Sequence, residues 1–460
     1  MSSRSSQRFQ AAGLHEKFRE EFCVDQGLDR LRLLGSDIVA PLAAGGSINY
    51  VSFDHAASAP VLQQVWDDVN AFIPYYASVN RGTGYLAEIS TDLFARSRDV
   101  VAEFLDLRED DQVIFTRSTT DSMSLLASSL PPGTCVYVFE SEHHASLLPW
   151  ERTAGEVVYM PVPRSHEEAV TTLRAELMQK STKSSLVCVT GASNVTGEIW
   201  PIVELARTAH LYGARIVVDA AQLAPHYPIS VQNWGVDWVA FSGHKIYAPF
   251  GAGVLAGRSD WLDSSKPYLA GGGASRSVIR RQDGSMAVEW HTGPARHEAG
   301  TPNLIGVLAI ASACRALTVA GRDALYERER RQVQYVLSKL AKLPDVRILR
   351  LFDEGHPRVA VVSFVVRGWE SSDFARRLSA EYGIGVRVGL FCAHPLVRSL
   401  LGEEEGSINE YCAGESTDSK GRFSPIRMSF GVDTPQEHLD RFIRAVCELI
   451  EQMPSGCSLE

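Results

Sequence analysis

The strongest constraint on the fold of this chain is an alternation of strand-like and helix-like segments that runs from Asn49 to Ile310. Short runs rich in β-branched residues are separated by stretches in which apolar residues recur with helical spacing. Several of the short runs are almost entirely apolar, which is typical of strands covered on both faces. The pattern therefore predicts an α/β domain built on a parallel sheet.

The predicted elements of this region follow one another at short intervals. The strands are Val113–Thr116, Val136–Glu140, Glu156–Val162, Leu186–Thr190, Arg215–Asp219, Asp237–Phe241 and Gly253–Gly257. The helices between them are Leu93–Leu105, Thr120–Leu130, His166–Lys180 and Val203–Tyr212. Ligands of open α/β sheets bind at the carboxyl ends of the strands, so we expect functional side chains just after them.

Beyond Pro302 the pattern changes and predicts a smaller α+β domain. Its helices are Leu304–Val319, Asp323–Leu343, Ser372–Tyr382 and Gln436–Gln452, and its strands are Arg347–Leu351, Val359–Val366, Gly385–Val388 and Ile426–Ser429. We predict a large domain over residues 46–310, a small domain over 311–460, and an N-terminal segment, 1–45, that packs with the small domain. The stretch Gly402–Arg422 is polar and turn-rich, which predicts a surface loop.

Composition and charge argue against several classes of protein. The 460 residues are 45% hydrophobic and 22% charged, which is typical of globular chains. A net charge of −10 without a run of Lys or Arg argues against a nucleic-acid partner. No apolar stretch is long enough for a membrane helix, and the N-terminus lacks the pattern of a secretory signal. The eight cysteines are scattered, which predicts neither a disulfide scaffold nor a zinc site. We therefore expect a cytoplasmic enzyme without a metal.

The segment Phe241–Gly253, FSGHKIYAPFGAG, places Lys245 just beyond an apolar strand and ahead of several glycines. Burial lowers the pKa of a lysine and makes its neutral, nucleophilic form accessible. The alternative is a solvated surface lysine, which is the commonest environment for this residue.

Asp219 ends another predicted strand, Arg215–Asp219, and Gln222 follows it. Enzymes that use pyridoxal 5′-phosphate (PLP) place a carboxylate against the pyridine nitrogen, because the protonated ring then acts as an electron sink. The alternative role for Asp219 is that of a helix N-cap. A lysine and an aspartate at one sheet edge together predict a PLP enzyme that holds its cofactor on Lys245.

Two further motifs follow predicted strands of the same sheet. Thr119 and Thr120 open a helix in TRSTTDS, and a helix N-terminus with hydroxyl groups can bind a phosphate; helix capping alone is the alternative. His143, in SEHHASLLP, can stack on the pyridine ring. The alternatives for this histidine pair are an ordinary turn and a metal site, and the metal site is discounted because no third ligand stands at a suitable spacing.

These motifs, in this order, resemble the aminotransferase class V family of PLP enzymes, and within it the group of cysteine desulfurases and selenocysteine lyase-like enzymes. The resemblance covers nearly all of Ser52–Leu449. The segments that carry it are FDHAASA (Phe53–Ala59), NRGTG (Asn80–Gly84), TRSTT (Thr116–Thr120), SEHHASLLPW (Ser141–Trp150), ASNVTG (Ala192–Gly197), VVDAAQ (Val217–Gln222), FSGHKIYAP (Phe241–Pro249), EAGTPN (Glu298–Asn303), VRVGLFCAHPL (Val386–Leu396) and IRMSFG (Ile426–Gly431). It implies the PLP-dependent transferase fold of type I, with a large parallel-sheet domain and a smaller α+β domain, and a homodimer with shared sites.

The resemblance also implies roles for individual residues. Around the cofactor ring, Lys245 is expected to form the Schiff base, with Asp219 at the pyridine nitrogen, Gln222 at the ring oxygen and His143 on the ring face. The expected phosphate ligands are Thr119, Thr120, Ser242 and His244, together with Thr301, which would reach the phosphate of the neighbouring subunit. The expected substrate contacts are Asn194, near the ring oxygen, and Arg427 at the carboxylate, with Arg387 as a second arginine.

Cys392 decides between the reactions that such a site can carry out. It lies in GLFCAHPL, at the place where desulfurases carry the cysteine that takes up sulfur as a persulfide. The predicted function is removal of sulfur from L-cysteine onto Cys392, with release of alanine and transfer of the sulfur to an acceptor protein. The alternative for Cys392 itself is an incidental cysteine, and two other functions remain open for the chain. One is another class V enzyme, an aminotransferase, racemase or lyase, that acts on a different amino acid. The other is a PLP-retaining scaffold or sulfur-relay protein with little turnover.

Overall fold

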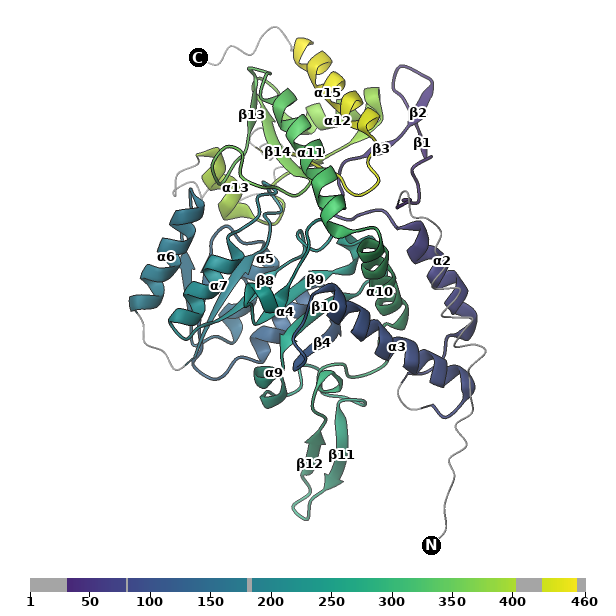
Figure 1. Cartoon of the computed structure of the whole chain (residues 1–460), viewed down its shortest axis with the longest axis vertical. Helices are drawn as coiled ribbons and strands as arrows, with labels where there is room; N and C mark the ends of the chain where they lie inside the picture. The colour runs from purple at the N-terminus through teal and green to yellow at the C-terminus, as the bar shows by residue number, and fades with distance from the viewer. Residues whose placement is uncertain (1–30, 80–81, 180–183, 403–423, 453–460) are drawn as a thin grey trace.

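The computed structural model describes residues 31–79, 82–179, 184–402 and 424–452. Its largest element is a seven-stranded sheet flanked by helices, with a smaller sheet above it (Figure 1). The strands of the large sheet are β4 (Asp111–Thr116), β5 (Cys135–Phe139), β6 (Glu156–Met160), β7 (Ser185–Thr190), β8 (Arg215–Asp219), β9 (Trp238–Ser242) and β10 (Gly253–Arg258). Their order across the sheet is β4-β10-β9-β8-β7-β5-β6. The predicted α/β architecture is confirmed.

One strand of the large sheet departs from the parallel arrangement that the sequence pattern predicts. β6, β5, β7, β8 and β9 pair in parallel, whereas β10 runs antiparallel to both of its neighbours, β9 and β4. A parallel connection needs a crossover of a dozen or more residues, usually a helix. The link between β9 and β10 contains only the short 3₁₀ helix η3 (Gly243–Lys245), so the chain turns back and β10 reverses direction. The sheet is therefore mixed.

Both faces of the large sheet are buried, which explains the apolar strand sequences. The successive residues Leu186 and Val187 of β7 are both fully buried but belong to different hydrophobic clusters, because neighbouring side chains in a strand point to opposite faces. Helices supply the cover: α2 (Gln63–Phe72), α3 (Tyr85–Phe104), α4 (Thr119–Ser128), α6 (His166–Gln179), α7 (Ile202–Leu211) and α10 (Leu304–Val319). α10 packs against α2 and α3, and it contributes twelve buried residues.

A separate hydrophobic cluster surrounds the smaller sheet. This sheet has the order β13-β14-β17-β16 and is antiparallel throughout. Its elements are the strands β13 (Val346–Ile348), β14 (Val361–Val366), β16 (Arg387–Val388) and β17 (Ile426–Ser429), with the helices α11 (Arg322–Leu340), α12 (Ser371–Tyr382) and α15 (Gln436–Glu451). The domain boundaries predicted from the sequence remain a prediction.

The described part of the N-terminal segment contacts both the large-sheet body and the smaller sheet. Near its start, the Leu34 N–H donates to the carbonyl of Val61 just before α2. The chain then forms a hairpin of β1 (Val39–Pro41) and β2 (Ser47–Asn49), and the Ala43 N–H donates to the carbonyl of Ala380 in α12. Next along the chain, β3 (Val51–Ser52) pairs in parallel with β15 (Ile384–Gly385). Residues 1–30 of the predicted segment, and nearly all of the predicted surface loop Gly402–Arg422, lie outside the described residues.

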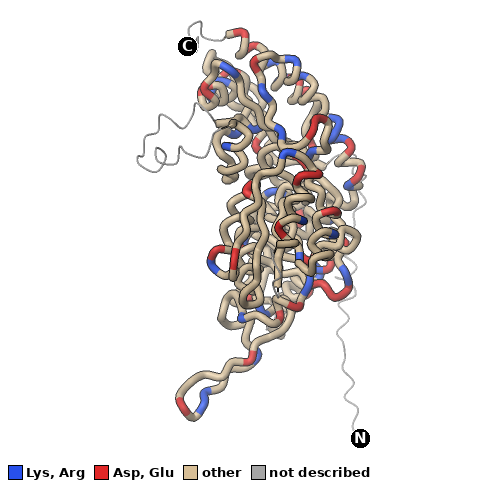
Figure 2. Tube along the Cα trace, turned by 90° about the vertical axis from the view of Figure 1, so that its left-hand side faces the viewer, with Lys and Arg blue, Asp and Glu red and all other residues tan. Residues whose placement is uncertain are grey.

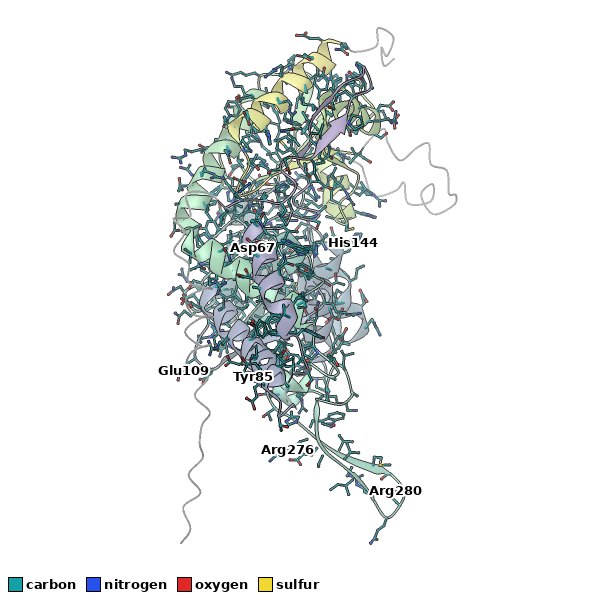
Figure 3. The ribbon with its side chains drawn as sticks, turned by 90° about the vertical axis from the view of Figure 1, so that its right-hand side faces the viewer. Asp67, Tyr85, Glu109, His144, Arg276 and Arg280 are labelled. Atoms are coloured by element: carbon teal, nitrogen blue, oxygen red, sulfur yellow. The ribbon has the colours of Figure 1, made fainter. Side chains whose placement is uncertain are left out.

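A hairpin that the sequence analysis did not predict projects from the large-sheet body. It consists of β11 (Ser275–Arg280) and β12 (Met286–Trp290), and it stands clear of the remainder of the molecule in two perpendicular views (Figures 1 and 2). Arg276 and Arg280 mark its course in Figure 3. Apolar side chains such as Ile279 are exposed on it.

No single helix among the described residues is long and apolar enough to span a bilayer. The pair α10 and α11 satisfies length and composition only when taken together, and the chain bends by 81° between the two helices.

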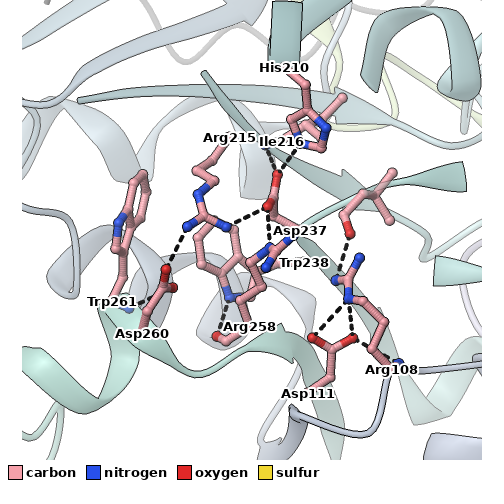
Figure 4. A network of polar contacts seen from close by, with 11 residues as sticks. Arg108, Asp111, His210, Arg215, Ile216, Asp237, Trp238, Arg258, Asp260 and Trp261 are labelled. Carbon is pink, nitrogen blue, oxygen red and sulfur yellow. Dashed lines mark hydrogen bonds and ion pairs between the residues drawn. The ribbon is translucent and has the colours of Figure 1, made fainter. Parts of the chain in front are cut away.

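A buried carboxylate fixes the amino-terminal ends of the central strands (Figure 4). The Asp237 side chain is 1% exposed and accepts hydrogen bonds from Arg215 Nη1 (2.7 Å), Arg258 Nε (2.6 Å), His210 Nε2 (2.8 Å) and the Ile216 N–H (2.9 Å). Burial alone would raise the pKa of Asp237, but the hydrogen bonds from His210, Arg215 and Ile216 outweigh burial and lower this pKa to about 2. The opposite ends of β8 and β9 are left free to carry functional side chains.

Candidate active site

A cavity of about 280 Å³ opens where β8 and β9 end. All but one of the predicted site residues line it, and they come from segments spread over more than 300 residues of sequence. These residues are Thr119, Thr120, His143, Asn194, Asp219, Gln222, Ser242, His244, Lys245, Arg387, Cys392 and Arg427. Thr301 does not line this cavity and is exposed.

Lys245 closes the 3₁₀ helix η3, which follows β9 directly. Burial lowers the pKa of Lys245 to about 8; the Asp219 carboxylate opposes this shift, and Arg427 adds to it. A substantial fraction of the amine is therefore neutral near pH 7 to 8, as a nucleophilic lysine requires.

Asp219 is the last residue of β8, and both of its oxygens are held in place. Oδ1 accepts a hydrogen bond from the Ala221 N–H (2.9 Å), and Oδ2 accepts one from Ser146 Oγ (2.5 Å). Each carboxylate oxygen can accept a second bond. Asp219 is thus a fixed, buried acceptor at the cavity wall. The contact of Ser146 was not predicted, although this serine stands in the motif SEHHASLLPW.

His143 is the N-cap of the short helix α5 (His144–Leu147), and this role orients its ring. Nδ1 accepts a hydrogen bond from the Ala145 N–H (3.0 Å), which leaves the proton of the neutral ring on Nε2. Burial, with the positive charge of Lys245 next in importance, lowers the pKa of His143 to about 4. The ring is therefore uncharged near neutral pH.

The N-terminus of α4 and the end of β9 meet at a second part of the cavity. Ser242 Oγ accepts the Thr119 N–H (2.7 Å) and also bonds Thr119 Oγ1 (2.7 Å). Glycine at position 253 permits this close approach, because a Cβ there would lie 2.7 Å from the Cα of Ser118. Hydroxyl and amide groups at a helix N-terminus form a site for an anion such as a phosphate.

Gln222 is buried, and only one end of its amide has a partner. Nε2 donates to the Ala56 carbonyl (2.8 Å), whereas Oε1 has no hydrogen-bond partner among the described residues. A buried polar atom without a partner is costly and rare in folded proteins. Gln222 lines the cavity, and because Oε1 is an acceptor, this end of the amide suits a bound molecule with a hydrogen-bond donor such as a ring hydroxyl.

Two arginines also line the cavity, and both contact Asp54. Arg427 is 4% exposed; its Nη2 lies 3.1 Å from Asp54 Oδ1, and its Nη1 donates to the Asn194 carbonyl (3.0 Å). Arg387 Nη1 lies 3.4 Å from Asp54 Oδ2. Asp54 stands within the motif FDHAASA, but the sequence alone predicted no role for it.

Cys392 is exposed, in contrast to the other cysteines that the structure describes, of which Cys135, Cys188 and Cys314 are buried and Cys447 is partly buried. It lies with Phe391 in a tight turn before α13 (His394–Leu401), and both residues adopt positive φ angles, 50° for Phe391 and 54° for Cys392. Two hydrogen bonds hold this turn: the His144 N–H donates to the Cys392 carbonyl (2.8 Å), and Asn194 Nδ2 donates to the Phe391 carbonyl (2.8 Å).

Comparison with known proteins matches residues 51–442 to the aminotransferase class-V family. A probable cysteine desulfurase of Mycolicibacterium paratuberculosis is 31% identical over 412 residues, which cover 87% of this chain and 55% of that relative, so this chain spans about half the length of that protein. A probable cysteine desulfurase of Vibrio cholerae is 32% identical over 412 residues, covering 87% of this chain and 94% of the relative. The crystal structure of the cysteine desulfurase CsdA from Escherichia coli superposes with a TM-score of 0.73 at 29% identity, covering 88% of this chain and 95% of that one.

Proposed function

The chain belongs to the aminotransferase class-V family, whose members depend on PLP, and on that premise we propose that it removes sulfur from L-cysteine and releases alanine. The observation that carries the proposal is that Cys392, an exposed thiol, lines the same cavity as Lys245. The likeness to probable cysteine desulfurases at 31% and 32% identity supports it.

The residues of the cavity fit PLP as a cofactor. Lys245 would hold it covalently, with Asp219 at the pyridine nitrogen, Gln222 at the ring oxygen and the uncharged ring of His143 on one face. The phosphate ligands would be Thr119, Thr120, Ser242 and His244. When bound, PLP supplies an electron sink for the bonds around the substrate's α-carbon.

The chain's own groups perform the remaining tasks. Arg427 and Arg387 bind the substrate carboxylate and orient the amino acid in the cavity. The neutral Nζ of Lys245 accepts the proton of the α-carbon, as general-base catalysis requires. Asp219, whose oxygens are held by Ser146 and the Ala221 N–H, would stabilise positive charge at the ring nitrogen.

Cys392 carries out the sulfur transfer. Its thiolate attacks the substrate sulfur, so that an S–S bond forms and the Cβ–S bond breaks; the electron pair of the broken bond is protonated at carbon. The products are alanine and a persulfide on Cys392, which passes its outer sulfur to a thiol of an acceptor protein or to a small thiol. The exposed position of Cys392 supports this last transfer.

The test measures alanine and sulfide formed from L-cysteine in the presence of a thiol reductant. Cys392→Ala is expected to abolish both products while leaving bound PLP unchanged, and Cys447→Ala, a partly buried cysteine outside the cavity, serves as the matched control. Lys245→Ala is expected to remove the covalent, borohydride-reducible attachment of PLP. Turnover that survives Cys392→Ala would refute the persulfide step and favour another class V reaction. A wild-type protein that binds PLP but forms no product from any amino acid would favour the scaffold alternative.

We also propose that the chain is a homodimer in which Thr301 reaches the phosphate of the neighbouring subunit. Exposure of Thr301 away from its own cavity supports this arrangement. Thr301→Ala would then weaken PLP binding although the residue lies outside the cavity of its own chain.

A further inference from the structure

The side chains of Asp54, Arg387 and Arg427 form a cluster that carries a net charge beside the cavity. Both arginines line the cavity, whereas Asp54 does not line it and contacts the two guanidinium groups instead. Two guanidinium charges against one carboxylate leave an excess of one positive charge. The cluster therefore has the charge to bind one anionic group.

The guanidinium N–H groups that Arg427 has left for a ligand also suit one bound anion. Asp54 and the Asn194 carbonyl each take one N–H of this guanidinium, and the ring of Phe391 lies 4.7 Å from its carbon and covers a face. Nε is buried and has no hydrogen-bond partner among the described residues. A buried, unpaired guanidinium N–H is a site that is ready for an acceptor such as a carboxylate.

We propose that Asp54 is a specificity-determining residue that limits the arginine pair to one substrate carboxylate. The substrate class is then α-amino acids with an uncharged side chain, and acidic amino acids such as aspartate are excluded. Asp54 acts through Arg427 and Arg387 rather than by touching the substrate. This inference rests on the proposed function only in that the cavity takes an amino acid; it does not depend on which bond is broken.

The charge of Asp54 can be changed with little change in shape. Asp54→Asn keeps an oxygen that can accept from Arg427, but it removes the negative charge and raises the excess at the cluster from one positive charge to two. Asp54→Glu keeps the charge. Asp92→Asn is the matched control, because Asp92 forms an ion pair of 2.9 Å with Arg96 at the surface, where the side chains are 53% and 46% exposed.

The probes are 3-mercaptopropionate and mercaptosuccinate, which carry one and two carboxylates and no amine. Their dissociation constants for the PLP-loaded protein are measured by calorimetry, so the result does not depend on turnover. We expect the wild-type protein and Asp92→Asn to prefer the monocarboxylate. In Asp54→Asn this preference should fall by about tenfold, the order expected for one unit charge roughly 10 Å from the second carboxylate at an effective dielectric constant of about 20.

Several outcomes would overturn the proposal. A purely structural role for Asp54 would change both dissociation constants by the same factor, and a preference ratio in Asp54→Asn equal to that of the wild type would exclude the charge argument. If Asp54→Asn does not fold, the wild-type ratio still decides, because equal binding of the two probes by the wild type contradicts the proposal. If the protein desulfurates cysteine but does not show the predicted ratio of the two dissociation constants, only the inference about Asp54 is rejected. If the ratio is as predicted but cysteine is not desulfurated, only the proposed reaction is rejected.

Discussion

Replacing Asp237 with asparagine tests whether the buried carboxylate between β8, β9 and β10 stabilises the fold as its contacts imply. Asparagine is nearly isosteric with aspartate, but it removes the charge and turns a donor toward Arg215 or Arg258. The Asp237 side chain is 1% exposed, and its side-chain partners Arg215, Arg258 and His210 are 27%, 40% and 39% exposed.

Two independent estimates give a similar magnitude. Removing one partner of a fully buried ion pair costs roughly 3–5 kcal/mol, and the partial exposure of these partners to water lowers the expected cost to about 2–3 kcal/mol. The fall in the pKa of Asp237 from 3.8 to about 2 corresponds to roughly 2 kcal/mol of stability at neutral pH. Because the pKa is lower in the folded state, this stability is present above about pH 4 and is lost as the pH falls toward about 2.

The assay is urea unfolding followed by tryptophan fluorescence, to which Trp238 and Trp261 beside Arg215 contribute. Asp260→Asn is the matched control, because Asp260 binds the same Arg215 but its side chain is 49% exposed. We expect Asp237→Asn to lower the free energy of unfolding by about 2–3 kcal/mol at pH 7, and Asp260→Asn to lower it by no more than about 1 kcal/mol, as for an exposed pair. Equal losses for the two variants at pH 7 would refute the reasoning, as would a loss for Asp237→Asn that does not shrink at low pH.

The other predictions concern the cavity. The rate at which the PLP-free protein forms a borohydride-reducible product with pyridoxal, the cofactor analogue without a phosphate, should rise through about pH 8, the pKa of Lys245, and then level off; a rate still climbing steeply at pH 10 would place Lys245 in water. Ser242→Ala removes the oxygen that binds Thr119 twice, so the affinity for PLP should fall by about tenfold or more, the loss of one or two hydrogen bonds to a polar site. Equilibrium dialysis of PLP measures this affinity, with Ser124→Ala on the exposed side of α4 as the control, and equal affinities for the two variants would contradict it.

Much of the large sheet could be predicted because its strands carry a strong local signal. The observed bounds of β8 coincide with the prediction, as do those of α10 and β17. Strand direction has no such local signal. The sequence of β10 is typical of a buried apolar strand in either orientation, and only the short link after β9 determines its direction. The β11–β12 hairpin was missed although Asp283–Gly284 between its strands is a typical hairpin turn. The helix α13 was also missed, although Pro395 near its start is a common first-turn residue.

Some residues of the cavity could likewise be predicted from the sequence, and others could not. The residues that follow predicted strands, such as Asp219 and Lys245, are found together because a parallel sheet brings strand ends to one edge. Asp54 is separated from Arg387 by 333 residues and from Arg427 by 373, so no local pattern links them. Ser146 lies 73 residues from Asp219, and its hydroxyl could equally have served as a cap. Such contacts join segments that are far apart in the chain, and sequence periodicity does not encode which of these segments meet.

The dipeptide His143–His144 interacts with both Lys245 and the turn of Cys392, the two residues proposed to react. The charge of Lys245 acts on the His143 ring, and the His144 N–H donates a hydrogen bond to the carbonyl of Cys392. A shift of this dipeptide would therefore disturb both the His143 ring and the backbone of the Cys392 turn. Because the His144 N–H is one of the two donors that hold this turn, the hydrogen-exchange rate of the His144 amide should report how often the turn separates from α5.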